Sequence, residues 1–342
     1  MQTNGNGRPD KPHKDHISRR AILSRAGISA AACALAAPVA VLPQASAQGA
    51  GVGSPVAASS EANPFRFGMN TSTLRGQKLP IAQLVEVVAK AGFQAIEPWI
   101  SELEDHVRRG GSLKDLGKQV RDLGLAVESS IAFPEWIVDD DARRAKGLEQ
   151  ARRNMAMVAE IGGLRMAAPP IGATNGPQID SQKISDRYRK LLELGDQIGV
   201  VPEVEVWGFS KTLTRLSDAA EVALNTGHPK ACILPDIYHL YKGGSPFAGL
   251  RLLSGQAVHV IHTNDYPANP PRAAIKDSDR VFPGDGVAPL ATIFRDLRDA
   301  GFRGTLSIEL FNPTYWQQDP QTVARTALAK TRAIVADALA AR

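Results

Sequence analysis

The stretch Ile184–Trp207, ISDRYRKLLELGDQIGVVPEVEVW, contains the unit from which this chain is built. Over residues 184–198 apolar side chains recur at intervals of three and four, a spacing that predicts a helix with one apolar face. Gly199 follows, and glycine often ends a helix because it tolerates the left-handed backbone conformation. The apolar run Val200–Trp207 then predicts a short buried strand. The stretch therefore indicates an α/β fold.

The same alternation repeats from Pro64 onward. Eight such units in about 275 residues predict a single-domain (β/α)₈ TIM barrel over residues 64–342. The alternative is a doubly wound open sheet, but Gly68–Ser72 lacks the glycine-rich phosphate turn that such a sheet ordinarily shows after its first strand. The predicted strands are Phe65–Asn70, Phe93–Glu97, Leu125–Ala132, Leu164–Ala168, Val200–Trp207, Ala231–Asp236, Ala257–Asn264 and Thr305–Phe311, with amphipathic helices such as Ile81–Ala91, Leu213–Leu224 and Leu290–Ala300 between them.

Composition excludes several other classes of protein. The chain has 342 residues, of which 43% are hydrophobic and 22% charged, so it is not collagen-like, disulfide-stapled or wholly disordered. Its formal net charge of +5 comes mostly from residues 1–47, which hold six basic and two acidic residues. The remaining chain has a net charge of +1, which gives no electrostatic reason to expect a nucleic-acid partner.

The first 47 residues resemble a twin-arginine signal peptide. Ser18-Arg19-Arg20-Ala21-Ile22-Leu23 is followed by the mildly apolar run Ala26–Leu42 and by the small-x-small sequence Ala45-Ser46-Ala47. The alternatives are a disordered basic tail, a lipoprotein acylated at Cys33, and a membrane anchor, which Pro38 and the alanine-rich composition disfavour.

Cleavage after Ala47 has three consequences. It leaves 295 residues in which Cys232 is the single cysteine, so an intrachain disulfide is excluded. It predicts a periplasmic or secreted protein with no stable membrane anchor. Residues 48–63, rich in Gly, Ala and Ser, then read as a flexible leader.

Four acidic or imidazole side chains stand at the ends of the last four predicted strands: Glu205, Asp236, His262 and Glu309. A charge at the end of a buried strand is costly unless it is paired or coordinated. Because the carboxyl ends of barrel strands surround one axis, the four groups are expected to converge there. Three carboxylates and one imidazole suit one divalent ion, Mn²⁺, Mg²⁺ or Co²⁺, with Zn²⁺ as an alternative.

These residues carry a family resemblance. The chain carries, in order, Glu205, Asp236-x-x-His239, His262-x-x-Asp265, Arg280 before Pro-Gly-Asp-Gly, and Glu309. This order resembles that of the xylose isomerase-like barrels of the sugar phosphate isomerase/epimerase superfamily. The resemblance implies that Glu205, Asp236, His262 and Glu309 bind the metal. It also implies that His239, Arg280 and Glu97 face the substrate. Asp265 either orients His262 or is a solvated loop charge.

Aromatic residues give a further hypothesis. The four tryptophans fall at or just beyond predicted strand ends, at Trp99, Trp136, Trp207 and Trp316. Aromatic faces stack on the C–H side of sugar rings, so a rim of them, with Trp207 next to Glu205, favours a small carbohydrate ligand. The alternatives are loop packing and a contact between copies in a homo-oligomer.

The expected chemistry is proton transfer beside a carbonyl. A divalent ion would chelate a sugar or keto-polyol and stabilise the enediolate, while Glu205 and Glu309 remove and return the proton. The outcome would be isomerisation or epimerisation.

Two alternatives remain open. One is a lyase, dehydratase or hydrolase acting on inososes or 3-keto-glycosides. Ketose 3-epimerases of the superfamily carry a second Glu six residues after the first metal ligand, where this chain has Lys211. The chain therefore departs from the ketose 3-epimerase pattern, which keeps the lyase alternative open. The other alternative is a non-catalytic periplasmic sugar-binding protein.

Overall fold

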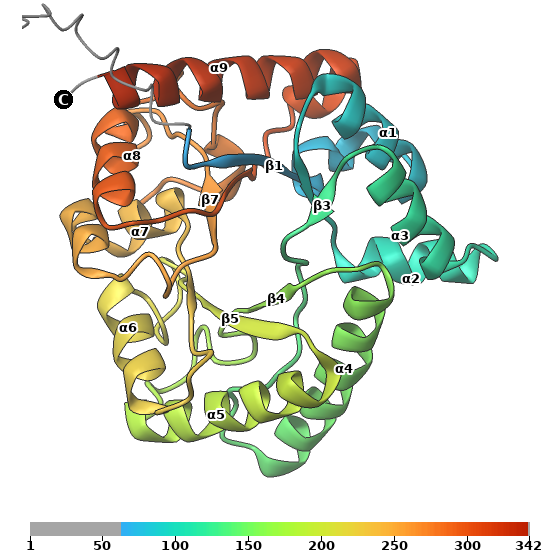
Figure 1. Cartoon of the computed structure of the whole chain (residues 1–342). Helices are drawn as coiled ribbons and strands as arrows, with labels where there is room; N and C mark the ends of the chain where they lie inside the picture. Colours follow the sequence, from blue (N-terminus) through green and yellow to red (C-terminus); the bar gives the residue numbers. More distant parts are fainter. Residues whose placement is uncertain (1–62, 341–342) are drawn as a thin grey trace, which may run out of the picture. The chain divides into compact units, whose positions relative to one another are not determined.

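The computed structural model describes residues 63–340. The predicted signal peptide and nearly all of the predicted leader lie outside these residues. Each predicted strand region contains a strand, although every strand is shorter than expected, and all eight run parallel, which confirms the TIM barrel (Figure 1). The strands are β1 (Arg66–Asn70), β2 (Ala95–Glu97), β3 (Ala126–Val127), β4 (Arg165–Ala168), β5 (Val201–Glu205), β6 (Ile233–Leu234), β7 (Val260–Thr263) and β8 (Thr305–Ile308).

The ring of strands is joined more weakly at two places. Continuous pairing gives one sheet in the order β3-β2-β1-β8-β7 and another in the order β4-β5-β6. Between β3 and β4 the backbone amides of Leu164 and Ala167 donate to the carbonyls of Val127 and Ser130. Between β6 and β7 single parallel bridges join Ile233 to Val258 and Asp236 to His262. The second bridge lies at the carboxyl end and sets two predicted site residues side by side.

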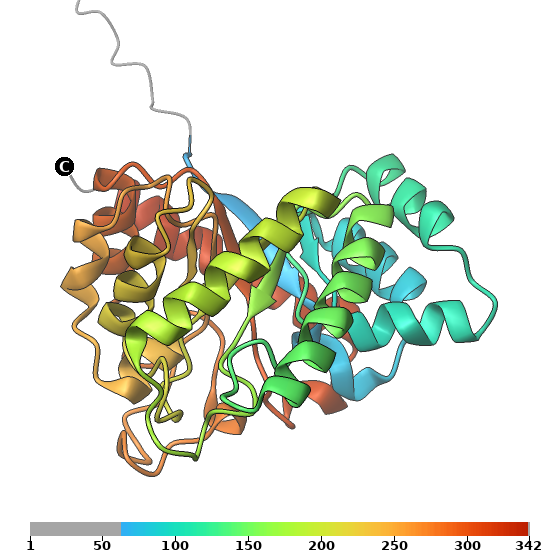
Figure 2. The same ribbon diagram turned by 90° about the horizontal axis from the view of Figure 1, so that it is seen from below.

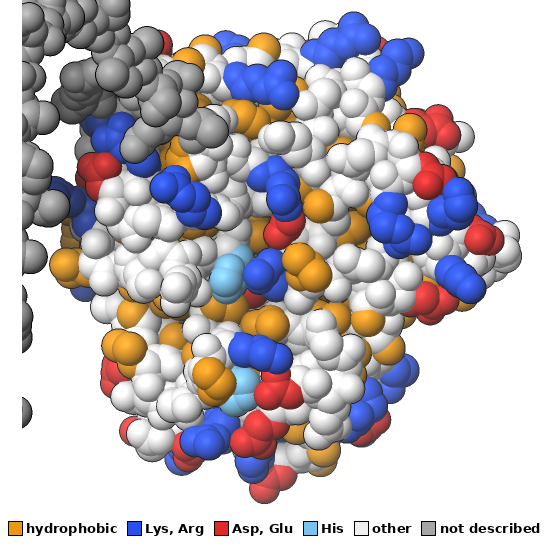
Figure 3. Space-filling model, viewed as in Figure 1, with side chains coloured by type: hydrophobic (Ala, Val, Ile, Leu, Met, Phe, Trp, Pro, Cys, Tyr) orange, Lys and Arg blue, Asp and Glu red, His pale blue; other side chains and the backbone are white. Residues whose placement is uncertain are grey.

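Helices surround the strands in both views of the ribbon (Figures 1 and 2). Their apolar faces pack on the barrel; in α1, for example, Ile81, Leu84, Val85 and Val88 are buried. None of the helices within residues 63–340 is long and apolar enough to cross a membrane. On the face shown in Figure 3, Lys and Arg side chains are interspersed with Asp and Glu. The helices are α1 (Ile81–Ala91), α2 (Ile100–Arg108), α3 (Leu113–Asp122), α4 (Asp141–Glu160), α5 (Ser181–Ile198), α6 (Leu216–Asn225), α7 (Ile237–Gly243), α8 (Leu290–Asp299) and α9 (Pro320–Ala340), with short 3₁₀ helices η1 (Thr71–Gln77), η2 (Phe247–Leu252), η3 (Asp277–Asp279) and η4 (Tyr315–Gln317).

The sixth strand ends two residues before its predicted end. Pro235 has no amide hydrogen, so β6 stops at Leu234, while the Pro235 carbonyl still accepts a hydrogen bond from the His262 amide at 3.0 Å. Asp236 then caps α7, because its Oδ1 atom accepts a hydrogen bond from the His239 amide at 2.9 Å. The proline thus converts the strand end into a helix start and leaves the second oxygen of Asp236 facing the barrel axis.

One buried hydroxyl ties α5 to the barrel. The Tyr188 hydroxyl lies 2.9 Å from the carbonyl oxygens of both Pro202 and Cys232, and it accepts a hydrogen bond from the Cys232 amide at 3.2 Å. Tyr188 is fully buried, and its ring packs against Trp136 with the centroids 5.9 Å apart. The helix is thereby fixed against β5 and the residue before β6.

We expect Tyr188→Phe to lower the free energy of unfolding by about 1–3 kcal/mol, because it leaves buried backbone groups without their partner. Urea-induced unfolding followed by circular dichroism measures this change. Tyr241→Phe is the matched control, because within residues 63–340 the Tyr241 hydroxyl makes no hydrogen bond. Equal free energies of unfolding in the two variants would contradict this role of the Tyr188 hydroxyl.

Candidate metal centre and active site

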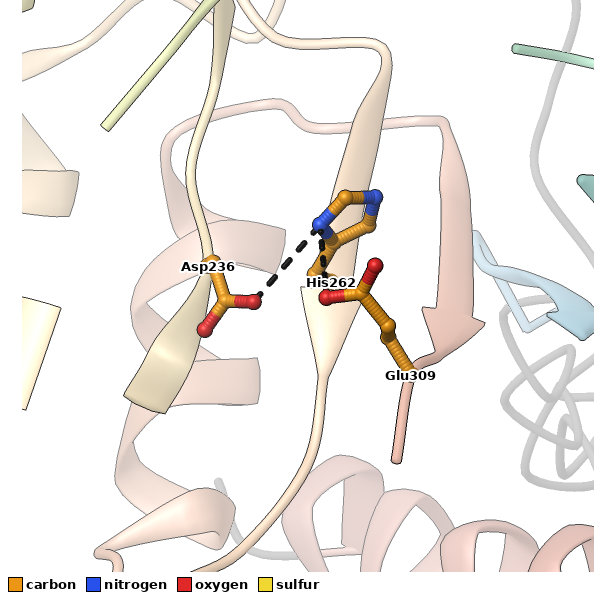
Figure 4. A group of neighbouring side chains, drawn as sticks. All are labelled: Asp236, His262 and Glu309. Atoms are coloured by element: carbon orange, nitrogen blue, oxygen red, sulfur yellow. Dashed lines mark ion pairs between the residues drawn. The ribbon is translucent and has the colours of Figure 1, made fainter. Parts of the chain in front are cut away.

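The four predicted metal ligands meet at the carboxyl end of the barrel. Glu205 ends β5, Asp236 follows β6, His262 lies in β7 and Glu309 follows β8. All four are buried. His262 Nδ1 lies 3.3 Å from Glu309 Oε2 and 3.6 Å from both Asp236 Oδ2 and Glu205 Oε1. Figure 4 shows Asp236 and Glu309 directed toward the His262 ring from the two neighbouring segments.

The donor set fits a divalent cation. Asp236, His262 and Glu309 each offer one ligand atom, and these three atoms lie within 4.8 Å of one another. Glu205 lies outside this group of three but reaches the same imidazole nitrogen. Within the described residues, His262 Nδ1 and Glu205 Oε2 are buried and make no hydrogen bond. Buried polar atoms without a partner are rare, and here they share one centre with oxygen and nitrogen ligands that divalent metals accept.

Glu97 holds the other side of the His262 ring. Its two carboxylate oxygens lie 3.1 Å and 3.2 Å from His262 Nε2. Burial opposes ionisation of Glu97, but His262 outweighs it and lowers the pKa of this carboxyl. An ionised carboxylate can only accept, so Nε2 carries a proton and donates it, and Nδ1 is the ring nitrogen that faces the three carboxylates.

Glu97 also makes hydrogen bonds to neighbouring strands. The sequence predicts that it faces the substrate; in the structure its Oε2 atom accepts hydrogen bonds from Asn70 Nδ2 at 3.0 Å and from Ser307 Oγ at 2.7 Å. Asn70 Nδ2 also lies 3.1 Å from Glu309 Oε1, so one amide holds two site carboxylates. Sequence reasoning missed Asn70 and Ser307; their one signal is their place in β1 and β8, on strands that flank the site.

Arg280 balances part of the negative charge. It is buried, and its Nη1 atom donates to Asp236 Oδ2 at 2.8 Å and to Glu309 Oε2 at 2.9 Å. These are the same two oxygens that face His262 Nδ1. Its Nη2 atom donates to Asp277 Oδ1 at 2.5 Å. The predicted substrate-binding residue therefore contacts candidate metal ligands directly.

Glu205 and Glu309 keep protons near neutral pH. Burial raises the pKa of Glu205 to about 8 and that of Glu309 to about 7, although the His262 charge works in the opposite direction. Burial also disfavours the charged form of Asp236, but Arg280 and His239 outweigh it and hold the pKa of Asp236 well below its ordinary value. Two groups of the site can thus exchange a proton at physiological pH.

His239 presents a free hydrogen-bond donor. Burial lowers its pKa to about 4, so the imidazole is neutral at pH 7. Its Nε2 atom accepts from Arg280 Nη2 at 3.2 Å, which places the ring proton on Nδ1. That Nδ1 atom is buried and without a partner among the described residues. The arrangement suits the predicted role of His239 in holding a substrate oxygen.

Asp265 acts differently from both sequence-based alternatives. It is buried, so it is not a solvated loop charge, and its oxygens contact backbone amides instead of His262. Oδ2 accepts from the amides of Gly284 and Gly286, both at 3.0 Å, and Oδ1 accepts from Tyr266 at 2.8 Å and Ala288 at 2.9 Å. A Cβ atom at Gly286 would lie 2.3 Å from Asp265 Oδ1, which explains why glycine stands there. Asp265 therefore fixes the loop that carries Arg280.

Four aromatic rings form a wall beside the site: Trp99, Phe133, Trp207 and Phe209. Successive ring centroids lie 5.1, 6.1 and 5.2 Å apart. The Trp207 ring centroid also lies 6.4 Å from that of His239, the other predicted substrate contact nearby. The expectation of a rim is wrong for Trp136, which is fully buried and donates from Nε1 to the Pro169 carbonyl at 2.9 Å.

The fold and the site together define a TIM barrel with three carboxylates around one histidine at its carboxyl end. This chain belongs to the xylose isomerase-like TIM barrel family, whose sequence model matches residues 85–334. A crystal structure of the IolI protein with a bound zinc atom is similar in fold, with a TM-score of 0.74 and 21% identity; the match covers 80% of this chain and 99% of that one.

Curated relatives are enzymes. Inosose isomerase of Bacillus licheniformis is 28% identical over 43% of this chain and 52% of its own length, so the chain spans about half of that relative. The 3-dehydroshikimate dehydratase of Pseudomonas putida is 24% identical over 68% of this chain and 36% of that protein. Fructoselysine 3-epimerase of Escherichia coli O157:H7 is 23% identical over 76% and 95%.

We expect Glu97→Gln to weaken metal binding about 10–100-fold, because the loss of its charge makes the His262 ring a poorer ligand. The dissociation constant for Mn²⁺ or Zn²⁺, measured by competition with a chromogenic chelator, tests this. Glu193→Gln on the exposed face of α5 is the matched control. An unchanged constant in Glu97→Gln would refute the orienting role.

Metal affinity should also rise with pH between about 6 and 8. Below the raised pKa values of Glu205 and Glu309 these groups carry protons that a metal must displace, and the raised pKa of His262 acts in the same direction. Titration calorimetry with Mn²⁺ in buffers of different ionisation enthalpy would show proton release on binding. In Glu205→Gln the release should diminish; pH-independent affinity in the wild type would contradict the assignment.

Proposed function

We propose that this protein is a divalent-metal-dependent isomerase or epimerase that moves a proton on the carbon beside the carbonyl of a sugar or keto-polyol. The observation that carries the proposal is the meeting of Glu205, Asp236 and Glu309 on His262 Nδ1. The relatives named inosose isomerase and fructoselysine 3-epimerase support this class of reaction. A bound divalent cation would supply Lewis-acid activation of the carbonyl.

The protein's own groups suit the remaining tasks. Burial raises the pKa of Glu205 to about 8 and that of Glu309 to about 7 in the metal-free site, so these carboxyls can hold and release a proton near neutral pH. Each can take the proton from carbon or return it. The unpaired Nδ1–H of His239 can donate to a substrate oxygen and fix the ring or chain in place. The aromatic wall covers an apolar face of the substrate.

A second candidate reaction is elimination of a group β to the carbonyl. Lys211, where ketose 3-epimerases carry a further Glu, lies exposed in the loop after β5. The relative named 3-dehydroshikimate dehydratase supports such a reaction. A β-leaving group on the same substrate would turn proton removal into dehydration or glycoside cleavage. We also propose that the N-terminal twin-arginine motif exports the protein, which favours a substrate outside the cytoplasm.

Solvent exchange tests the proposal without knowledge of the product. We expect Mn²⁺-loaded protein in D₂O to introduce deuterium beside the carbonyl of at least one member of a keto-sugar panel, as seen by NMR. Glu205→Gln and Glu309→Gln should slow this exchange about 10²–10⁴-fold. Glu149→Gln, an exposed change on α4, is the control.

Two results would separate the alternatives. Sugar binding without deuterium exchange in the metal-loaded wild type would favour the non-catalytic sugar-binding protein. Exchange that persists after chelation, with metal analysis confirming its removal, would refute metal dependence. Loss of the β-substituent in the exchanging substrate would identify the eliminating enzyme.

A further inference from the structure

A second arginine stands at the catalytic end of the barrel without a partner. Arg75 lies in η1, directly after β1, and its side chain is half-buried. Across residues 63–340 no acceptor forms a hydrogen bond or ion pair with its guanidinium, whose contacts are ring stacking. Burial lowers the pKa of Arg75, and the nearby charges of Glu102 and Glu309 offset this only in part. The positive charge of Arg75 is therefore only partly balanced by neighbouring negative charges.

Stacking places this guanidinium beside the candidate metal ligands. Its central carbon lies 3.5 Å from the Trp99 ring centroid and 5.9 Å from that of Phe311. Trp99 Nε1 donates to Asn70 Oδ1 at 2.9 Å, and Asn70 Nδ2 donates to Glu309 Oε1 at 3.1 Å. Arg75 is thus joined through two side chains to Glu309, on the side of the site where the aromatic wall begins.

The segment that carries Arg75 is fixed. Asn70 caps η1 by accepting a hydrogen bond from the Ser72 amide, and the Ser72 carbonyl accepts another from Trp316 Nε1 at 3.0 Å. A Cβ atom at Gly76 would lie 2.0 Å from Trp316 Cβ, so the chain passes close under η4. The Arg75 side chain therefore extends from a well-packed backbone segment.

The two arginines near the site differ in their hydrogen bonding. Arg280 is engaged by Asp236, Asp277 and Glu309. The carboxylate whose charge most offsets the burial of Arg75 is Glu102. Its Oε2 atom accepts hydrogen bonds from the Thr71 hydroxyl at 2.6 Å and the Trp99 amide at 3.0 Å. Arg75 keeps donors in a planar fork that matches a carboxylate.

We propose that the substrate carries a carboxylate that binds Arg75, so that the reaction acts on a polyhydroxy keto acid. This inference rests on the proposed function, because the ketone end must lie near Glu205 and Glu309. A monoanion fits better than a phosphate dianion. One guanidinium supplies the charge, and the neighbouring Glu102 and Glu309 would repel a second negative charge.

Matched ketoses that differ in one group test the inference. D-fructuronate and D-tagaturonate replace the terminal CH₂OH of D-fructose and D-tagatose by a carboxylate. We expect the Mn²⁺-loaded protein to bind at least one uronate about 10-fold or more tightly than its neutral partner, as measured by titration calorimetry. Arg75→Gln should weaken that uronate about 10–100-fold and leave the neutral ketose unchanged. Arg75→Lys, which keeps the charge, should restore part of the preference.

The controls give every result a meaning. Arg109→Gln, exposed at the end of α2, should alter neither ligand. Absence of a uronate preference in the wild type, or equal weakening of both ligands in Arg75→Gln with a lowered melting temperature, would overturn the inference. Tighter binding of D-fructose 6-phosphate than of D-fructuronate would overturn the choice of carboxylate.

The inference and the proposed function can fail separately. An Arg75-dependent uronate preference without deuterium exchange would retain the carboxylate site and refute the isomerase. Exchange in neutral ketoses that is unaffected by Arg75→Gln, with no uronate preference, would retain the isomerase and refute the carboxylate site.

Discussion

Electrostatic repulsion between three buried carboxylates governs this structure. Glu205, Asp236 and Glu309 all lie within 3.6 Å of one imidazole nitrogen, in surroundings that exclude water. Such a cluster costs free energy unless positive charge or protons offset it. Arg280 supplies one charge, and burial keeps protons on Glu205 and Glu309 near neutral pH. The negative charge that remains favours a bound cation. Because such a cation would bind only the folded state, it would also stabilise the barrel.

The barrel brings this cluster together through its closure. β6 and β7 touch only through single bridges, one of which pairs Asp236 with His262. Pro235 shortens β6 and turns Asp236 into the cap of α7, so one oxygen serves the helix and the other serves the site. On the opposite side of the His262 ring, Glu97 from β2 reaches across the barrel to fix the imidazole. Structural and chemical roles are therefore shared by the same side chains.

The sequence predicted the barrel and the four converging groups because both depend on periodic patterns. Apolar spacing and glycine stops locate strands, and strand ends locate the axis. Contacts across the barrel have no such pattern. Glu97 and His262 are 165 residues apart, and the neutral Asn70 and Ser307 show no charge to attract attention. The role of Asp265 cannot be predicted from the sequence because its partners are backbone amides, which every residue but proline possesses.

The way Asp265 holds its loop has a consequence for how the protein can change. The four hydrogen bonds come from main-chain nitrogens, so they do not depend on which side chains occupy the neighbouring positions. Val281, Asp285 and Val287 can be randomised in a directed-evolution library while the backbone path, and with it the register of Arg280, is preserved. Substitutions along this segment can thus change ligand specificity while the charge balance around Arg280 is kept.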